Sequence, residues 1–567
     1  MDRIFRRTNL WRGKWDALRG DRTYGEITIA TAIANTTEVW KGGGRKRQTS
    51  KKVRTADAEG TGLPMIQIND RQLRDTTALA IDALLAANNP PEIFVRMGQL
   101  GRVKTDEEGR PAIDILKENG LRYYLSQAAD FVRVGNEVVK VSPPKDLVQN
   151  ILAAPEWPFP PLRGIVEVPV LRPDGSILAA PGYDPATKLF YCPLPGPPIA
   201  PILPSSPNQQ DAVNCIDFIL GEQLADFPFA DDSSRANTLA ALLTPIVRHA
   251  IPGPVPLGLF DAPQAGTGKT KLVEIIGMIS TGRWTPMHSP PMRRDDDAEW
   301  SKVITSALLK GSTVVCFDNV DGVLRSPALA LALTVKVYSD RILGTNQQPE
   351  IPVNCSWFAT GNNIQLGGDL PRRCYWIRLD AKMSRPWKRD NFRHQDLEGW
   401  VTETRSKLSA ALLTLAQAWF VAGQPGSDSP ILGSYQAWCR TVGGILKFAG
   451  VEGFLGNLEA MHERADLEGQ EWEAFLRAWR DHYGDAVVLV KELVEITQEE
   501  EGTVIRDALP SRLQEAMNKK GSGFVRSLGR ALQIKDGVHF GDLGLHLVRV
   551  PNADKKSGAN GWRVLTY

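Results

Sequence analysis

Apolar residues recur at different periods along this chain, and the changes of period divide it into segments. Between residues 71 and 88 apolar residues recur at helical spacing, and a pair of prolines ends the helix that they predict. Residues 93–97 and 165–170 are short apolar runs separated by turn residues, which is typical of strands. We therefore expect an α+β accessory domain over residues 60–192.

The pattern changes after residue 192. Residues 193–207 are too rich in proline for a helix or a sheet interior, so they predict a linker. Over residues 208–425 helices alternate with short apolar strands, which indicates a parallel sheet covered by helices. We expect a helical connector over residues 426–472.

The last segment, residues 473–567, has the order of a winged helix. Helix-like runs precede a candidate recognition helix over residues 522–532, and two apolar runs then flank a polar turn at residues 554–558, which would be the wing. The charges expected to contact DNA phosphates are Arg526, Arg530, Lys555, Lys556 and Arg563. The alternative is a winged helix that only packs against the rest of the protein.

Length and composition predict several domains, and together with the alternating helices and strands they make multidomain α/β the expected fold class. Its 567 residues are 42% apolar and 23% charged, enough to bury several cores. It has no run of 18 uncharged apolar residues and no secretory leader, so we expect no membrane partner and a cytoplasmic location. The six Cys occur singly, which predicts neither a zinc site nor a disulfide framework.

The net charge is only +2, but the first residues are basic. Residues 1–55 contain 14 Lys and Arg against five Asp and Glu. We interpret residues 1–59 as a basic arm and linker that can contact phosphate backbones without reading sequence. A solvated tail is the alternative.

One loop indicates specific chemistry. Residues 261–272 read DAPQAGTGKTKL, between a strand-like run and a helical run. Such a loop holds nucleotide phosphates with its backbone N–H groups and a Lys, and a Thr hydroxyl coordinates Mg²⁺. The cofactor-binding residues predicted here are Ala265, Gly266, Thr267, Gly268, Lys269, Thr270 and Lys271, with Thr270 as a metal ligand. Pro263 stands where the usual pattern has its first glycine.

Three later segments supply what hydrolysis of a nucleotide requires. The apolar run of residues 313–318 ends in Asp318, a second candidate metal ligand. Residues 355–363 end in Thr and Asn, which can orient water, and residues 368–373 end in two arginines that can stabilise a transition state. We therefore expect ATP and Mg²⁺ as cofactors.

GTGKT, VVCFDN, ATGNN and DLPRR, in this order, resemble the core of an AAA+ ATPase. Residues 333–344 resemble part of the superfamily III and MCM-like helicases encoded by phages and mobile genetic elements. The resemblance implies a central P-loop ATPase over residues 208–425, with a helical lid at residues 390–424. It also implies a ring, usually a hexamer, with ATP between subunits and single-stranded DNA in the channel.

The resemblance also assigns roles. Lys269 would bind the phosphates and Asp318 the Mg²⁺ side; Asn362, or less favoured Asn363, would sense the γ-phosphate; and Arg372 or Arg373 would act on the ATP of a neighbouring subunit. Asn319 stands where the family has a glutamate that polarises the attacking water. Asp318, Asp321 or Glu299 could replace that glutamate, and the choice stays open.

Residues 341–353 can form a hairpin, which faces the channel in this family. Lys336 or Arg341 would there meet DNA phosphates, contacts that hold a strand without reading its sequence. An ordinary surface crossover is the alternative.

Two function classes follow. The first is an ATP-dependent, ring-forming DNA helicase or translocase in the replication of a phage-like or mobile genetic element. The second is an AAA+ DNA-binding initiator or loader that switches with nucleotide and does not unwind. The expected partners are single- and double-stranded DNA, further copies of the chain, and a separate primase or loader.

Overall fold

The computed structural model describes a defined part of the chain. The described residues are 18–19, 22–23, 62–107, 109–194, 203–291, 297–341, 348–426, 428–465, 467–518 and 523–567. Most of the expected basic arm, the centre of the proline-rich linker and the tip of the expected hairpin therefore lie outside the described residues. Two compact units are distinguished, residues 1–71 with 130–142 and residues 72–129 with 143–567, and each is described by itself.

The first unit contains a small mixed sheet. Strand β3 (Met65–Gln67) pairs in parallel with β7 (Asp130–Val134), which pairs antiparallel with β8 (Val138–Val141). Asn69 extends the pairing, because its Nδ2 donates to the Val134 carbonyl at 2.7 Å and its Oδ1 accepts from the Val134 N–H at 2.8 Å. Strands β1 (Leu18–Arg19) and β2 (Arg22–Thr23) form a separate short pair.

The second unit begins with three helices and an antiparallel sheet. The helices are α3 (Leu73–Ala87), α4 (Glu118–Ala128) and α5 (Lys145–Leu152), and the strands are β4 (Ile93–Arg96), β5 (Gln99–Thr105) and β6 (Pro111–Ile115). The helix and strand expected at residues 71–88 and 93–97 are thus present.

The hydrophobic core does not follow the boundary expected at residue 192. Strands β9 (Gly164–Val166), β12 (Gly182–Asp184) and β13 (Leu189–Tyr191) form a small sheet. Val166, Leu171 and Tyr191 are buried in the same hydrophobic cluster as the central sheet that follows. The apolar side chains of residues 166–191 therefore complete the central domain and do not form a core of their own.

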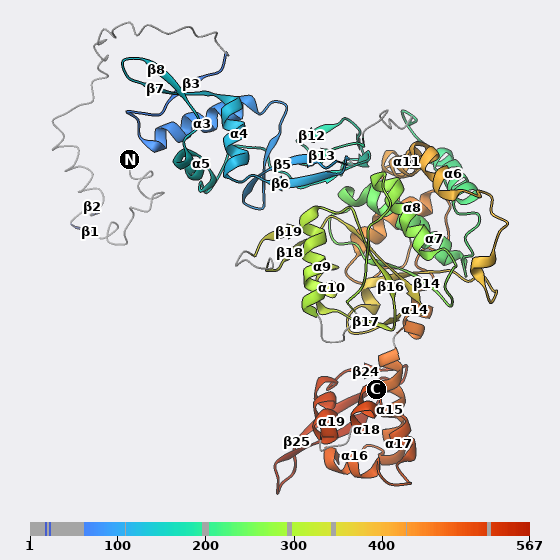
Figure 1. Cartoon of the computed structure of the whole chain (residues 1–567). Coiled ribbons are helices and arrows are strands. Elements are labelled where there is room, and N and C mark those ends of the chain that lie inside the picture. The colour runs from blue at the N-terminus through green and yellow to red at the C-terminus, as the bar shows by residue number, and fades with distance from the viewer. Residues whose placement is uncertain are drawn as a thin grey trace. The chain divides into compact units, whose positions relative to one another are not determined.

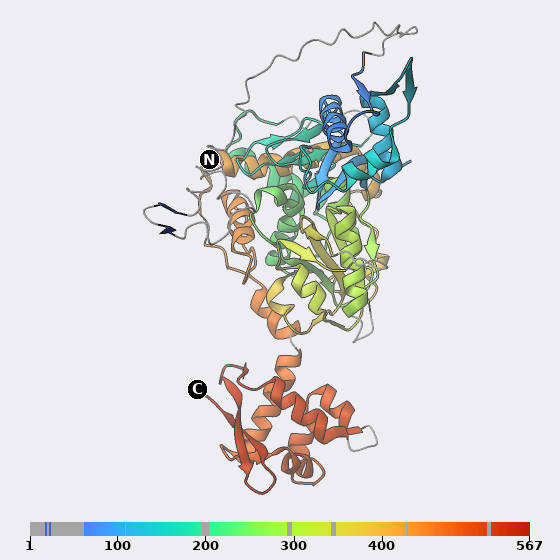
Figure 2. The ribbon, with the colours of Figure 1, turned by 90° about the vertical axis from the view of Figure 1, so that its left-hand side faces the viewer.

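The centre of the second unit is a five-stranded parallel sheet, as the sequence predicts. Its strand order is β15 (Met287–His288), β16 (Val314–Val320), β20 (Ser356–Asn362), β14 (Leu257–Ala262), β22 (Cys374–Arg378). These strands are near-continuous apolar runs because helices cover both faces of the sheet. Helix α8 (Lys269–Thr281) packs on β14, β16 and β20 (Figures 1 and 2).

The remaining helices of this domain surround the sheet. They are α6 (Gln209–Phe218), α7 (Asp232–Val247), α9 (Asp297–Lys310), α10 (Pro327–Ala332) and α11 (Leu397–Val421). Helix α11, expected within residues 390–424, begins at residue 397 because the Asp396 Oδ1 accepts from the Gly399 N–H at 2.9 Å and caps it. Helix α11 packs against α6 and α8.

The expected connector contains short helices that pack on the same core. They are α12 (Gln436–Trp438), α13 (Gly444–Phe448) and α14 (Leu458–Ala465). Trp438 and Ile445 are fully buried in the cluster that also contains the central sheet. Among the described residues, no helix combines the length and the apolar character needed to cross a membrane.

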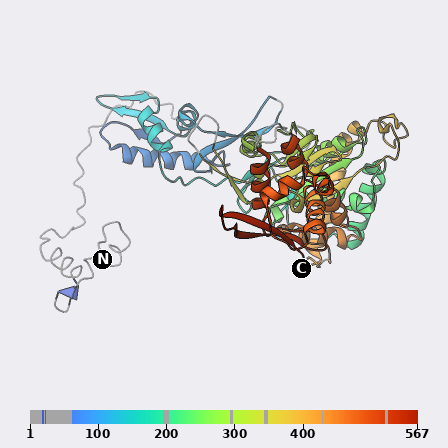
Figure 3. The same ribbon diagram turned by 90° about the horizontal axis from the view of Figure 1, so that it is seen from below.

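The last domain has a hydrophobic core of its own, which contains Trp472, Phe475, Trp479 and Leu528. Its helices are α15 (Leu467–Tyr483), α16 (Val490–Ile496), α17 (Thr503–Asp507), α18 (Ser511–Asn518) and α19 (Gly523–Ile534). The antiparallel sheet has the order β23 (Val488–Leu489), β26 (Ala559–Leu565), β25 (Leu545–Asp554), β24 (His539–Phe540). The hairpin of β25 and β26 extends beyond the helices of this domain (Figure 3).

Candidate functional site

The loop between β14 and α8 depends on two glycines. Gly266 and Gly268 have φ angles of 78° and 98°, in the left-handed region that glycine adopts without strain. A Cβ at Gly266 would lie 3.0 Å from the Cβ of Trp387, and one at Gly268 would lie 3.0 Å from Cε1 of Phe227. The left-handed backbone and these close neighbours together favour glycine at both positions.

Lys269, the first residue of α8, lies inside this loop and is 8% exposed. Its Nζ donates to Asn362 Oδ1 at 2.8 Å and to the Gln264 carbonyl at 3.3 Å. Burial lowers the pKa of Lys269, while Asp261 and Asp318 favour the charged amine. A nearly buried amine held by neutral oxygens is suited to bind an anion in place of those oxygens.

Asp318 joins the loop to the next two strands of the sheet. Its Oδ1 accepts from the Thr270 hydroxyl at 2.9 Å and also from the Thr360 hydroxyl. The hydroxyl of Thr270 and the carboxylate of Asp318 are the hard oxygen ligands that Mg²⁺ prefers. The structure therefore brings Lys269, Thr270, Asp318 and Asn362 together at the carboxyl ends of β14, β16 and β20.

Asn319 occupies a bulge in β16. Its φ is 59°, its backbone N–H donates to Thr360 Oγ1 at 3.1 Å, and its side chain is exposed. Of the alternative bases, Glu299 forms an ion pair with Lys302 on α9, and Asp321 is exposed. Asp318 alone among the three contacts Thr270 within the described residues.

A buried ion pair supports the loop, and sequence reasoning missed it. Asp261, at the end of β14, accepts from Arg378 Nη1 at 2.6 Å and from the Ile364 N–H at 3.0 Å. Both side chains are buried, and burial raises the pKa of Asp261. The pair holds the turn after Asn362 against β14 and β22. The only sequence signal is an acid at the end of an apolar strand.

The two candidate arginines, Arg372 and Arg373, differ in their contacts. Arg373 is 12% exposed and donates to the Ala330 carbonyl and, at 2.8 Å, to the Thr334 hydroxyl, so it fastens the end of α10. Arg372 is 66% exposed and pairs only with Asp369 in the described part of the chain. Neither is described in contact with residues 263–270, so neither completes the site of its own chain.

Asn363, the less favoured sensor residue, contacts the loop backbone instead of the Lys269 amine, because its Nδ2 donates to the Pro263 carbonyl at 3.4 Å. Its φ is 48°, and its Oδ1 accepts from Arg464 Nη2 at 3.0 Å. Asn362 is the one of the two asparagines that contacts the Lys269 amine.

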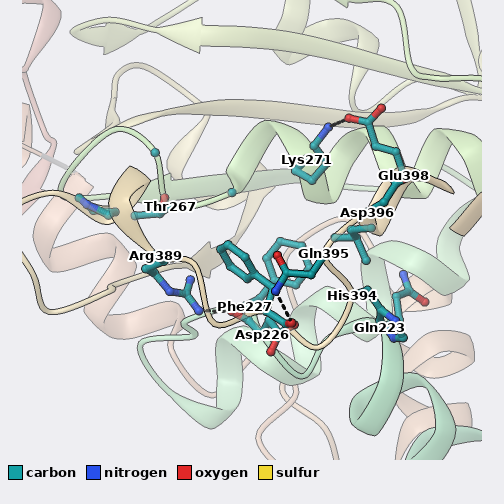
Figure 4. Close-up of a pocket in the computed structure, with 15 residues that line it drawn as sticks. Gln223, Asp226, Phe227, Thr267, Lys271, Arg389, His394, Gln395, Asp396 and Glu398 are labelled. Carbon is teal, nitrogen blue, oxygen red and sulfur yellow. Dashed lines mark hydrogen bonds and ion pairs between the residues drawn. The ribbon is translucent and has the colours of Figure 1, made fainter. Parts of the chain in front are cut away.

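A cavity of about 360 Å³ adjoins the loop (Figure 4). Gly266, Thr267, Gly268 and Lys271 form one wall, and Phe227, Phe392 and residues 394–398 form others. Residues 393–398 are held in place at both ends. The Arg393 N–H donates to Asp226 Oδ2 at 2.7 Å, and Glu398 forms an ion pair with Lys271. The cavity suits a planar organic group attached to phosphates in the loop.

Sequence reasoning missed this cavity, because its walls come from segments far apart in the chain. Lys271, expected to bind the cofactor, pairs with Glu398 and, at 2.8 Å, with Glu274. Ala265, the remaining expected residue of the loop, is exposed.

The expected hairpin begins earlier than residue 341. Strands β18 (Val337–Ser339) and β19 (Glu350–Pro352) pair antiparallel, with Val337 opposite Pro352. Tyr338 is buried between the exposed Val337 and Ser339, and it anchors the stem. Lys336 and Arg341 are exposed before and after β18.

The basic residues expected in the last domain fall into two groups. Arg526 and Arg530 are exposed on α19, and Lys555 and Lys556 are exposed in the turn between β25 and β26. Arg563 is half-buried on β26, and its Nε is buried, so it is less accessible than the other four.

Comparisons with known proteins add the following. The family model described as the NrS-1 polymerase HBD domain matches residues 1–42. No curated protein sequence matches the chain.

Three solved structures are similar at low identity. The NrS-1 C-terminal region in an apo form is 12% identical, with 86% of this chain and 99% of that chain covered and a TM-score of 0.36. The SCCmec type IV Cch active helicase is 11% identical, with 84% and 93% covered and a TM-score of 0.32. JCV helicase with a bound small molecule is 14% identical, with 45% and 73% covered and a TM-score of 0.20. TM-scores this low do not establish a shared fold.

Proposed function

We propose that this chain is an ATP-dependent, ring-forming DNA helicase or translocase of the AAA+ class, acting in the replication of a phage-like or mobile genetic element. One observation carries the proposal: Lys269, Thr270, Asp318 and Asn362 converge at the carboxyl ends of three neighbouring parallel strands. This is the arrangement that hydrolysis of a nucleoside triphosphate requires.

Each of these side chains has a task in that reaction. The Lys269 amine would leave Asn362 Oδ1 for the β- and γ-phosphate oxygens, because a charged acceptor is the stronger partner. Thr270 and Asp318 would hold Mg²⁺, which neutralises charge on the phosphates when bound. The amide of Asn362, once released, is free to orient the attacking water. The adenine ring of the nucleotide would lie in the adjoining cavity of about 360 Å³.

Arg372 is the better candidate for an arginine that acts in trans. It is exposed, whereas Arg373 is engaged within its own chain. A guanidinium from a neighbouring subunit would stabilise the charge of the transferring phosphoryl group, which makes hydrolysis dependent on assembly. We therefore expect a ring, with a hexamer as its form.

DNA would be held by two basic surfaces. Lys336 and Arg341 flank a hairpin strand and are free to contact a single strand in the channel. We interpret residues 473–567 as a winged helix, with α19 as the recognition helix and residues 554–558 as the wing, which would contact duplex DNA.

Asn319 favours a second candidate function. An amide can position water but cannot accept its proton, and Asn319 is exposed where the AAA+ pattern has a glutamate. A chain with slow hydrolysis would serve as an initiator or loader that switches with nucleotide and does not unwind.

Strand displacement on a forked duplex with ATP and Mg²⁺ separates the two functions. We expect the natural chain to unwind and Lys269→Ala to lose unwinding and hydrolysis by about 100-fold or more. Lys407→Ala, an exposed lysine of α11, is the matched control and should behave as the natural chain. Duplex binding without unwinding by the natural chain would support the initiator instead. A chain that fails to retain ATP with Mg²⁺ would contradict both functions.

A further inference from the structure

A second, smaller cavity lies at the other end of the central sheet. It has a volume of about 30 Å³, and Arg96, Arg163, His249, Ser312 and Asn354 are among its lining residues. Two further lining residues, Thr313 and Cys355, directly precede β16 and β20. The nucleotide loop faces the carboxyl ends of these strands, so this cavity cannot be part of that site.

Among the residues that the structure describes, Arg96 is a buried cation without a counter-charge in this cavity. Its side chain is 4% exposed, and its Nε and Nη1 atoms are buried without a hydrogen-bond partner among the described residues. Burial lowers its pKa to about 10, so the guanidinium is still charged at neutral pH. Burying an unpaired charge destabilises the folded state, and an anionic ligand would offset that cost.

Backbone hydrogen bonds join the segment that carries Arg96 to the segment that carries Arg163. The Val95 N–H donates to the Pro160 carbonyl at 2.9 Å, and the Leu162 N–H donates to the Val95 carbonyl at 2.9 Å. The Arg163 N–H donates to the Lys188 carbonyl at 2.8 Å, which fixes the start of β9. Arg163 has an exposed side chain, so it stands at the open side of the cavity.

The charge around the cavity is one-sided. No Asp or Glu is among its described lining residues. Arg248, next to His249, is 5% exposed, and its Nη2 donates to the Val353 carbonyl at 2.8 Å, so it adds positive charge nearby. Burial, together with Arg248 and Arg163, lowers the pKa of His249 to about 3, so His249 is neutral.

We propose that this cavity is a binding site for a single phosphate group, held by Arg96 and Arg163. The planar fork of arginine matches phosphate oxygens, and Ser312 and Asn354 supply neutral donors beside it. The cavity of about 30 Å³ exceeds the roughly 10–15 Å³ that one water requires, yet it is far too small for a nucleoside. The phosphate is therefore either free orthophosphate or the terminal phosphate of a nucleic-acid strand, with the rest of that strand outside.

The experiment titrates the full chain with phosphate at constant ionic strength, with chloride as the control anion. Calorimetry measures the binding, and the midpoint of thermal unfolding measures the stabilisation. Phosphate would also enter the nucleotide loop, so all chains carry Lys269→Ala, which makes the result independent of the proposed function. We expect saturable binding that Arg163→Gln weakens about tenfold, or about 1.4 kcal/mol. Arg122→Gln, an exposed arginine of α4, is the matched control and should bind as the parent does.

Arg96→Gln should abolish the binding. Because Arg96 is buried and this variant can fail to fold, the exposed Arg163 variant carries the test. Equal effects of chloride and phosphate, or equal binding by the Arg163 and Arg122 variants, would overturn the proposal.

A second arm identifies the source of the phosphate. A single-stranded oligonucleotide with a 5′-phosphate is compared with the same oligonucleotide without it, in the parent and in Arg163→Gln. A 5′-phosphate preference that Arg163→Gln removes supports a terminal phosphate. Saturable orthophosphate binding without such a preference supports the free anion.

Discussion

Single residues with the same chemistry have different surroundings in this protein, and the neighbouring arginines 372 and 373 illustrate this. Both follow Pro371 in a short turn before β22. Arg373 is directed into its own domain, where it satisfies the Ala330 carbonyl and the Thr334 hydroxyl at the end of α10. Arg372 extends into solvent, where another subunit could use it.

Replacing each arginine by alanine separates stability from catalysis. We expect Arg373→Ala to lower the free energy of unfolding by about 2 kcal/mol, because it removes hydrogen bonds made by a charged group. Arg372→Ala should change it by less than about 0.5 kcal/mol, since its ion pair is exposed. Arg372→Ala should instead lower ATP hydrolysis of the assembled protein by about 1,000-fold. Urea unfolding and steady-state hydrolysis measure the two effects, and a stable, fully active Arg372→Ala would contradict the role in trans.

Glu167 predicts a pH dependence at the residue scale. Burial raises its pKa from 4.5 to about 7, against the opposing effect of Arg283 and Arg405 beside it. Because the folded state then holds a proton that the unfolded state has lost, the free energy of unfolding should fall as pH rises from about 4.5 to about 7. The fall is about 3 kcal/mol at most, at 1.36 kcal/mol per pKa unit.

Glu167→Gln should remove this part of the pH dependence. Urea unfolding at a series of pH values from 4.5 to 7 measures it in both chains. The two curves would run parallel if Glu167 were ionised throughout that range.

At the scale of elements, the described part of the β18–β19 hairpin combines a buried anchor with exposed cations. Its stem is held by the buried Tyr338, whose hydroxyl lies 3.5 Å from Ser301 Oγ on α9. Lys336 and Arg341 remain exposed on either side of β18. A firmly anchored stem with exposed cations can hold a nucleic-acid backbone in a defined place.

Neutralising these cations should weaken single-stranded DNA binding without affecting the fold. We expect Lys336→Ala and Arg341→Ala each to reduce the slope of log K against log salt by about 0.7, the value for one phosphate contact on a single strand. Fluorescence anisotropy over a salt series measures the slopes, with Lys407→Ala as control. Unchanged slopes in both variants would show that the hairpin is an ordinary surface connection.

At the scale of the whole molecule, no single chain holds a complete hydrolytic site in this proposal. The loop, Asp318 and Asn362 come from one chain, whereas the arginine would come from the next. Ring formation would therefore control when ATP is hydrolysed, and hydrolysis would rise with protein concentration as subunits assemble.

Mixing two inactive variants tests this directly. Lys269→Ala retains Arg372, and Arg372→Ala retains the loop, so some interfaces in a mixed ring contain both functional parts. We expect an equal mixture to recover about one quarter of the hydrolysis rate of the natural chain, since an arginine acts in trans at random interfaces. Each variant measured alone should show little ATP hydrolysis. A mixture no more active than its components would contradict a shared site.

The amino-acid sequence by itself determined the local features of the protein. Apolar runs and turn residues predicted the strands β14, β16 and β20, because buried parallel strands must be apolar on both faces. The glycines of the loop and the Lys-Thr pair predicted a phosphate-binding loop, because glycine lets a backbone approach phosphates, while Lys and Thr supply a positive charge and a metal-binding hydroxyl. These properties depend on neighbours along the chain.

Only the tertiary structure decided which distant residues meet. Nothing in the sequence pairs Asp261 with Arg378 or encloses a cavity between Phe227 and Phe392. Nor does it show that Arg96 is buried without a counter-charge in the described part of the chain. The hydrophobic core crosses the boundary expected at residue 192 for the same reason, since apolar residues before it pack with those after it. Burial and partner choice result from packing between segments far apart in the chain, and local pattern carries no information about that packing.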